Sequence, residues 1–181
     1  MSWFHYFFDK LYPLIRFVYE KVMGHRWYSE ITDMIWLGGA PSQKKDYAYL
    51  LRQGIRAVVD IRQERSDNLD LYAEQNIAHL KLPVPDMRMP PPDVLTKGVN
   101  FMKEQIDQGH IVYVHCAKGR GRSAALVVAY LMKHHGISYE KAKNLLEIKR
   151  SLVKLEARHE EGVKAWMALS RMEEKQALSK Q

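Results

Sequence analysis

The stretch IVYVHCAKGRGRS, residues Ile111–Ser123, decides the fold and gives the first indication of chemistry. Its first four residues are β-branched or aromatic, which is typical of a short buried strand. A loop with Gly119 and Gly121 follows, and the apolar run from Ala124 to about Lys133 predicts a helix. A strand, a glycine-bearing loop and a helix N-terminus in this order present backbone N–H groups to an anion, typically a phosphate.

The polar residues of this loop each have a chemical reason to be there. Backbone N–H donors at a helix N-terminus lower the pKa of a thiol such as Cys116, and the thiolate is the nucleophilic form. Arg122 offers a planar fork that can bind two phosphoryl oxygens at once. Ser123 is placed to hydrogen-bond the sulfur, and His115 to buttress the loop through backbone hydrogen bonds. A buried structural cysteine beside a basic turn is the alternative, but such a cysteine needs no glycine-bearing loop.

Composition narrows the class of protein further. A chain of 181 residues is expected to form one domain with its own core. Its single cysteine excludes an intramolecular disulfide and favours a reducing compartment. The eight histidines show no zinc-type spacing, so we expect no metal site and no cofactor. The net charge of +7 favours an acidic partner, and phosphorylated substrates or anionic lipids rank above nucleic acid because no nucleic-acid-binding motif is visible.

Strands and helices alternate along the rest of the chain. We expect strands at residues 34–37, 55–61, 77–82 and 111–114. We expect helices at about residues 42–53, 69–75, 93–108, 124–133, 138–149 and 156–178, with Asp93 as a helix cap. Gly38-Gly39 is expected to form a turn. This order predicts an α/β domain with a central, mostly parallel sheet of about four to five strands flanked by helices. The Cys116 loop then lies at a strand's C-terminal end, where such sheets bind ligands.

The two ends of the chain are expected to differ from this domain, which spans residues 27–171. Residues 1–26 carry an aromatic and apolar stripe at helical spacing, with charged residues on the opposite side. Charged residues and Pro13 interrupt the stripe, so a membrane crossing is not expected. Two interpretations stay open: the helix packs on the domain, or it lies in a membrane interface. Residues 172–181 are expected to fray.

Two further segments bear on the chemistry. The loop PVPDMRMPPP, residues 83–92, is stiffened by its prolines and carries Asp86. Displacing an alkoxide from phosphate near neutral pH requires proton donation to the leaving oxygen, and Asp86 is the candidate donor. The charged run at residues 62–68 is expected to be a solvated face. Arg150 and Lys154 are expected either to extend a basic surface or to solvate a helix.

The stretch HCAKGRGRS, residues 115–123, resembles the HCxxGxxRS/T signature of the cysteine-dependent protein-tyrosine and dual-specificity phosphatases. Within that superfamily the chain is similar to the mitochondrial-type phosphatidylglycerophosphate phosphatases and their bacterial and plant relatives. The similarity runs to about Trp166 and includes His25-Arg26-Trp27-Tyr28, Leu37-Gly38-Gly39-Ala40-Pro41, Val84-Pro85-Asp86-Met87, Lys97-Gly98-Val99 and Ala129-Tyr130-Leu131.

The resemblance implies a dual-specificity phosphatase fold and hydrolysis through a cysteinyl-phosphate intermediate, without a metal. The implied catalytic residues are Cys116, Arg122, Asp86, Ser123 and His115. The implied substrate-binding residues are Ala117, Lys118, Gly119, Arg120 and Gly121. Phosphatidylglycerophosphate is the first choice of substrate, with phosphoinositides or inositol polyphosphates and protein phosphotyrosine as alternatives. The implied setting is the cytoplasm or mitochondrion, with peripheral contact to an anionic membrane.

Overall fold

A computed structural model describes residues 16–179, so most of the expected N-terminal helix lies outside the described residues. The strands are β1 (Tyr28–Thr32), β2 (Ile35–Gly39), β3 (Ile55–Arg62), β4 (Ala78–Val84) and β5 (Ile111–Cys116). The helices are a short turn η1 (Val18–Val22), α2 (Lys44–Arg52), α3 (Leu69–Glu74), α4 (Pro92–Asp107), α5 (Arg122–His134), α6 (Tyr139–Lys149) and α7 (Ala157–Leu178).

The five strands form one sheet in the order β1-β2-β5-β3-β4. Strand β1 pairs antiparallel with β2, and all the other pairs are parallel. The expected α/β fold with a mostly parallel sheet is therefore confirmed. Strand β1 was not expected, because its five residues and the tight turn at Asp33 are too short to stand out from a connecting segment.

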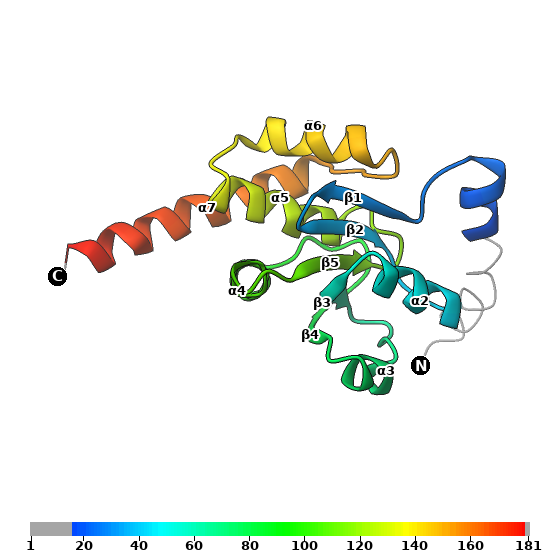
Figure 1. Cartoon of the computed structure of the whole chain (residues 1–181). Helices are drawn as coiled ribbons and strands as arrows, with labels where there is room; N and C mark the ends of the chain where they lie inside the picture. The colour runs from blue at the N-terminus through cyan, green and yellow to red at the C-terminus, as the bar shows by residue number, and fades with distance from the viewer. Residues whose placement is uncertain (1–15, 180–181) are drawn as a thin grey trace.

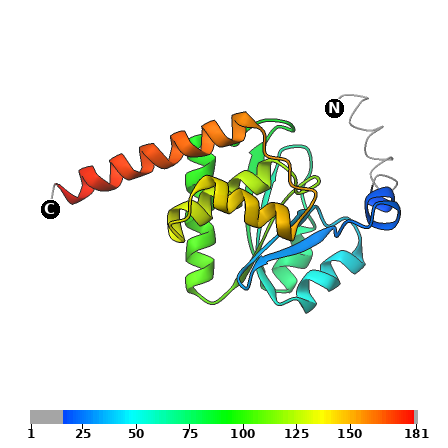
Figure 2. The same ribbon diagram turned by 90° about the horizontal axis from the view of Figure 1, so that it is seen from above.

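Helices cover both faces of the sheet (Figures 1 and 2). Helices α4 to α7 lie on one face and α2 and α3 on the other, and side chains alternate between the two along each strand. On β5, Val112 and Val114 join the cluster under α4 to α7, whereas Tyr113 joins an aromatic cluster with Trp27 and Trp36 on the opposite face. The sheet is thus buried on both sides, as parallel sheets usually are.

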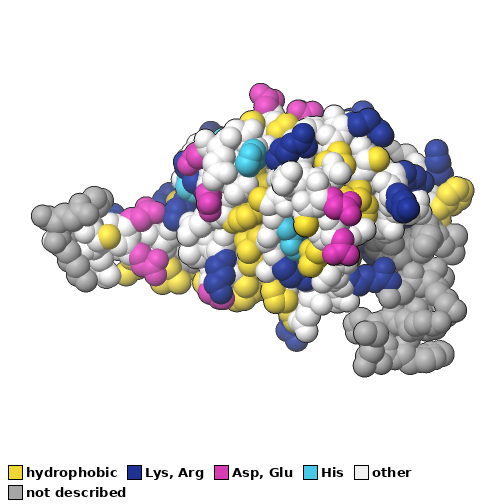
Figure 3. Space-filling view, turned by 60° about the horizontal axis from the view of Figure 1, so that its bottom comes forward, with side chains coloured by type: hydrophobic (Ala, Val, Ile, Leu, Met, Phe, Trp, Pro, Cys, Tyr) yellow, Lys and Arg dark blue, Asp and Glu magenta, His cyan; other side chains and the backbone are white. Residues whose placement is uncertain are grey.

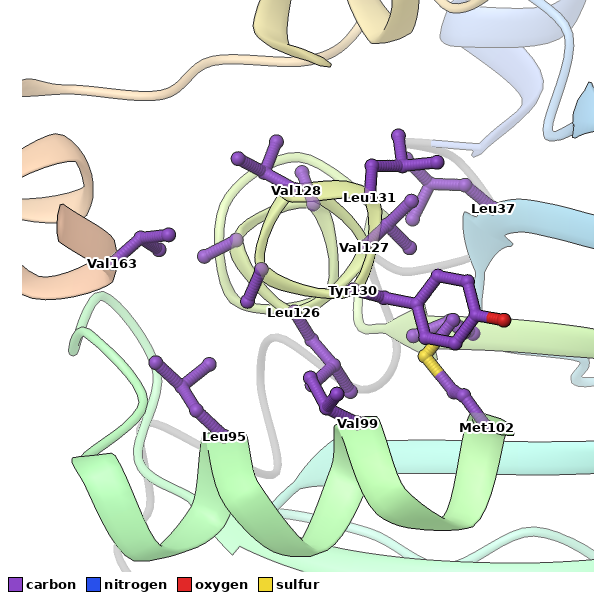
Figure 4. Packing of buried hydrophobic residues seen from close by; sticks show 14 of the residues in the cluster. Leu37, Leu95, Val99, Met102, Leu126, Val127, Val128, Tyr130, Leu131 and Val163 are labelled. Carbon is purple, nitrogen blue, oxygen red and sulfur yellow. The ribbon is translucent and has the colours of Figure 1, made fainter. Parts of the chain in front are cut away.

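Helix α5 is the central helix of the domain and is buried on nearly every side. Figure 4 shows Leu126 pointing toward Val99 of α4, below α5 in this view, and Val163 of α7 to the left of α5. Gly98 permits the close contact with α4, because a Cβ there would lie 2.7 Å from a Leu126 methyl group. Burial of each large aliphatic side chain contributes roughly 1.5–3 kcal/mol. This packing fixes the start of α5, which carries Arg122, against the sheet.

One helix boundary and one turn differ from expectation. Helix α4 begins at Pro92 with Pro91 before it, so Asp93 lies in the first turn and is not the cap. Gly38-Gly39 was predicted to be a turn, which is wrong: both residues end strand β2. A Cβ on Gly38 would lie 2.5 Å from the Tyr113 hydroxyl, and a Cβ on Gly39 2.3 Å from the Trp27 ring. The glycines are needed for this close packing, not for a turn.

The described part of the N-terminal segment both packs on the domain and exposes apolar side chains. Arg16 is buried against Trp27 and Tyr28, and its Nη1 lies 2.6 Å from Asp46 Oδ2. Phe17 and Met23, in contrast, are more than half exposed. No helix in the part of the chain that the structure describes is long and apolar enough to cross a membrane. At the other end, α7 stays helical to Leu178 and projects beyond the domain (Figure 1).

Candidate active site

The site is built around the loop that joins β5 to α5, hereafter the phosphate loop (residues 116–122). Cys116 is the last residue of β5 and Arg122 the first of α5, so the order of strand, loop and helix is as predicted, but each element reaches two residues further into the loop than expected. Gly119 has a φ of +64°, and a Cβ there would lie 2.2 Å from the carbonyl oxygen of Gly38. Only glycine fits this combination of backbone conformation and close approach. The Gly121 carbonyl accepts a hydrogen bond from the Ala125 N–H and so begins α5.

Cys116 lies at the base of the loop with 4% of its surface exposed. The Ser123 Oγ donates to its sulfur over 3.3 Å. Burial alone raises the pKa of the Cys116 thiol, but the positive charge of Arg122 and hydrogen bonds from Ser123 and the Arg120 backbone N–H outweigh burial. The net result is a thiol whose pKa is lowered from its ordinary value. The loop therefore favours the nucleophilic thiolate form.

Arg122 is buried, and the guanidinium is held from several sides. Its Nη1 donates to Glu64 Oε2 and to the Val84 carbonyl oxygen, both over 2.8 Å. Its Nη2 donates to Glu64 Oε1 over 2.7 Å and lies 2.8 Å from Asp86 Oδ1. Glu64 thus binds Arg122 through both carboxylate oxygens, which fixes the plane of the fork. Burial alone raises the pKa of Glu64, but Arg122 outweighs this and keeps that pKa below its usual value.

The segment that contains Glu64 and Asp67 was predicted to be a solvated charge run, which is wrong for both residues. Glu64 is half-buried on Arg122, and the Asp67 carboxylate is fully buried. The Tyr72 hydroxyl donates to Asp67 Oδ2 over 2.9 Å, and Arg62 Nη2 lies 2.5 Å from Asp67 Oδ1. The one signal in the sequence is the position of the run after a buried strand, at the sheet edge where β5 also ends.

His115 is held by these carboxylates and not by the backbone contacts expected for it. Its Nε2 lies 2.8 Å from Asp67 Oδ2, and its ring stacks on Tyr113. Asp60 completes the cluster: it binds Arg62 over 2.8 Å and Lys81 over 2.7 Å. Burial raises the pKa of both aspartates, yet His115 and Arg62 lower it to below the ordinary value. The cluster fixes His115, the residue that precedes the nucleophile in β5.

Asp86 lies on the loop between β4 and α4, at the mouth of the site. Its side chain is 71% exposed, and its Oδ1 accepts from the Met87 N–H over 2.9 Å. Met87 has a φ of +60°, which is uncommon for a residue with a side chain. Met89 anchors the far side of the loop against α7, where a Cβ on Gly162 would lie 2.9 Å from its side chain. The structure thus brings Asp86 to Arg122, although the two are far apart in sequence.

The basic residues around the phosphate loop fall into two groups. Lys118 and Arg120 are half-buried at its rim, and Arg120 donates to the Leu152 carbonyl over 3.2 Å and to the Tyr19 hydroxyl over 3.3 Å. Lys154 is exposed, and its backbone N–H donates to the Arg120 carbonyl over 2.9 Å. Arg150 is neither a surface cation nor a solvated helix residue, contrary to prediction: it is buried behind the loop.

Comparison with known proteins places this geometry in a family. A family model described as "dual specificity phosphatase, catalytic domain" matches residues 35–168. Phosphatidylglycerophosphate phosphatase PTPMT2 of Arabidopsis thaliana is 32% identical over 131 residues, which are 71% of this chain and 56% of the plant protein. The human phosphatidylglycerophosphatase and protein-tyrosine phosphatase 1 is 34% identical over 152 residues, which are 79% of this chain and 74% of the human protein. The chain therefore spans little more than half of the plant relative.

Solved structures resemble the chain to a similar extent. The crystal structure of PTPMT1 in complex with PI(5)P has 28% sequence identity and a TM-score of 0.72. The match covers 78% of this chain and 94% of that protein. The family and the fold are thus supported by independent comparisons of sequence and structure.

Proposed function

The chain belongs to the dual specificity phosphatase family, and from this premise we propose that it hydrolyses a phospholipid phosphomonoester through a cysteinyl-phosphate intermediate. Phosphatidylglycerophosphate is the first choice of substrate. The observation that carries the proposal is the phosphate loop itself. It holds Cys116 with a lowered thiol pKa and with hydrogen bonds from the backbone N–H groups of Arg120 and Ser123, and it ends at Arg122.

In the first step the Cys116 thiolate attacks phosphorus. The phosphorus–sulfur bond forms as the bond to the alkoxide oxygen breaks, and Asp86 gives its proton to the departing oxygen. The N–H groups of the loop and the guanidinium of Arg122 bind the equatorial phosphoryl oxygens, on which negative charge is concentrated. These groups are in place before substrate arrives, so little reorganisation accompanies the reaction.

The contact between Asp86 and Arg122 has a part in this step. Nη2 of Arg122 is shared between Glu64 and Asp86, whereas Nη1 is shared between Glu64 and a carbonyl. A phosphoryl group that binds two N–H groups of Arg122 at once requires at least one of these donors. Asp86 is the exposed partner, and ion pairs of exposed groups contribute little free energy. We therefore expect phosphate to displace Asp86 and not Glu64, which frees the acid to reach the leaving oxygen.

In the second step water attacks the cysteinyl phosphate. The oxygen–phosphorus bond forms, the phosphorus–sulfur bond breaks, and Asp86 takes the proton from the water. The Ser123 hydroxyl, which donates to the sulfur over 3.3 Å, stabilises the departing thiolate. His115, which is held by Asp67, fixes the end of β5 next to Cys116. A reducing compartment, cytoplasmic or mitochondrial, suits an enzyme whose single thiol is its nucleophile.

The preference for a lipid rests on the names of the relatives and on the charge at the rim. The plant and human relatives are named as phosphatidylglycerophosphate phosphatases. Lys118 and Arg120 place two cations within the loop, where a substrate with a second anionic group would bind. Phosphoinositides meet the same description, and they are the second candidate because a structural relative was solved with PI(5)P.

Peripheral membrane contact is the second part of the proposal. The exposed apolar residues Phe17, Val22 and Met23 lie beside the exposed cations Lys21 and Arg26. This segment touches the phosphate loop through Tyr19 and Arg120. On the face drawn in Figure 3, Lys and Arg side chains gather toward the end opposite the projecting part of α7. An apolar surface flanked by cations fits an anionic bilayer and would bring the loop to the headgroups.

A panel of equal concentrations of phosphatidylglycerophosphate, phosphoinositides and a phosphotyrosine peptide tests the substrate. We expect the largest kcat/KM for phosphatidylglycerophosphate, and a wide margin in favour of the peptide would contradict the lipid assignment.

Binding to anionic vesicles tests the membrane contact. The double variant Phe17→Ser/Met23→Ser should bind more weakly than the wild type. The matched control Leu169→Ser/Met172→Ser, on α7, should bind as strongly as the wild type. It is matched in exposure, because Met172 is 58% exposed and Met23 is 55% exposed. Equal binding by both variants would contradict the contact.

A further inference from the structure

Arg150 directly follows α6 and lies behind the phosphate loop, with only 3% of its surface exposed. Its guanidinium donates to two carbonyl oxygens of the loop: Nε to Gly119 over 2.9 Å and Nη2 to Lys118 over 2.8 Å. Nη1 points to the segment just before β1, where it donates to the carbonyl oxygens of Arg26 and Trp27. One buried fork therefore joins the outer side of the loop to the edge of the sheet.

The two loop carbonyls are informative because of the peptide groups to which they belong. In a trans peptide the C=O of one residue and the N–H of the next point in opposite directions. With the Gly119 carbonyl turned outward to Arg150, the Arg120 N–H is turned inward, and this N–H donates to the Cys116 sulfur. The same argument turns the Gly119 N–H inward, opposite the Lys118 carbonyl.

The loop needs such a restraint at this point. Gly119 has a positive φ and no side chain, so its flanking peptide groups can rotate more easily than those of any other residue type. A rotated peptide would aim a carbonyl dipole at the thiolate and at the phosphate. A fork that binds both carbonyls at once opposes that rotation for two consecutive peptides.

We propose that Arg150 is a positioning residue of the reaction, which holds the Lys118 and Gly119 carbonyls outward so that the next two N–H groups face the sulfur and the phosphate. This inference rests on the proposed function, because it assigns those N–H groups a part in catalysis. A purely structural role, the satisfaction of buried carbonyls, would lower stability without altering the acidity of the thiol.

The experiment measures alkylation of Cys116 by iodoacetamide as a function of pH, on the full chain. Compared variants are Arg150→Met, which keeps the apolar stem, and Arg150→Lys, which keeps the charge but cannot bridge two carbonyls with a planar fork. We expect the midpoint of the pH profile to rise by about one pH unit in both, as for the loss of one oriented hydrogen bond to a charged acceptor. Arg158→Met, which removes an exposed arginine paired with Glu156, should leave the midpoint unchanged.

Each result either supports or overturns the role of Arg150. A wild-type midpoint in Arg150→Met would overturn the proposal, and a wild-type midpoint in Arg150→Lys would assign the effect to charge and not to orientation. Should Arg150→Met fail to fold, the midpoint of Arg150→Lys against that of the wild type provides the test. Turnover of p-nitrophenyl phosphate, measured in parallel, keeps the two hypotheses apart. No turnover by the wild type would refute the proposed function, even if the Arg150 variants shift the midpoint. Turnover by the wild type with an unshifted midpoint in both variants would refute the role of Arg150.

Discussion

Replacing Glu64 by glutamine tests the idea that a carboxylate holds the phosphate-binding fork in place. In the structure both oxygens of Glu64 accept from Arg122, over 2.8 and 2.7 Å. Glutamine keeps one acceptor, but it places an NH₂ group against the guanidinium and removes the negative charge. A hydrogen bond to a charged group contributes about 1.5–3 kcal/mol. At about 1.4 kcal/mol for each factor of ten in rate, we expect kcat/KM to fall roughly 10- to 100-fold.

The same change should not raise the pKa of the Cys116 thiol, although it lowers turnover. Arg122 lowers the pKa of Cys116, and Glu64 partly neutralises Arg122. Without the carboxylate the field at the sulfur becomes more positive, so the pKa of the thiol should fall or stay the same while turnover drops. The assays are steady-state kinetics with p-nitrophenyl phosphate and the pH profile of Cys116 alkylation.

The control for this experiment is Asp70→Asn, which removes an exposed carboxylate from the neighbouring helix α3. It should leave both measurements unchanged. Wild-type kcat/KM in Glu64→Gln would refute the reasoning, because it would mean that Arg122 does not need its carboxylate partner. A rise in the thiol pKa would contradict the electrostatic part of the argument.

Three further outcomes are expected. Asp86→Asn should reduce kcat by about 10²- to 10⁴-fold for an alkyl phosphate. It should reduce kcat far less for p-nitrophenyl phosphate, because that leaving group needs no proton. Equal losses for both substrates would contradict the role of Asp86 as acid. Asp67→Asn, measured by urea unfolding near neutral pH, should cost about 1.5–3 kcal/mol, since it removes the charged acceptor that faces His115 and one of the two carboxylates that bind Arg62. Because His115 and Arg62 keep the pKa of Asp67 depressed in the folded state, its contribution is present above the unfolded value of about 4 and is lost as the pH falls below it, so the wild type should lose stability in acid more steeply than the variant.

The sequence predicts the phosphate loop well because its chemistry is local. Strand, cysteine, glycines, arginine and helix follow one another between Ile111 and Lys133, and the structure has them in that order. The sheet follows from the alternation of strands and helices. Strand β1 escaped prediction because it is short and gains its place by pairing with β2, which depends on the whole fold.

The residues that support the loop could not be predicted in the same way. Glu64 contacts Arg122 across 58 positions of sequence, and Arg150 contacts Gly119 across 31 positions. Charged residues usually face solvent, so nothing in the sequence near Glu64 or Arg150 indicates these contacts. Gly38 and Gly39 looked like a turn because glycine pairs usually are. Glycine is needed at these positions because Tyr113 and Trp27 pack closely against them, and that contact depends on the folded structure.

Trapping the covalent intermediate tests the central claim most directly. The full chain is mixed with phosphatidylglycerophosphate, quenched in acid within one turnover and digested, and the peptides are weighed by mass spectrometry. We predict one added phosphoryl group on the peptide that contains Cys116, and none in Cys116→Ser. Turnover of the lipid without that phosphopeptide, or full turnover by Cys116→Ser, would contradict the cysteinyl-phosphate mechanism.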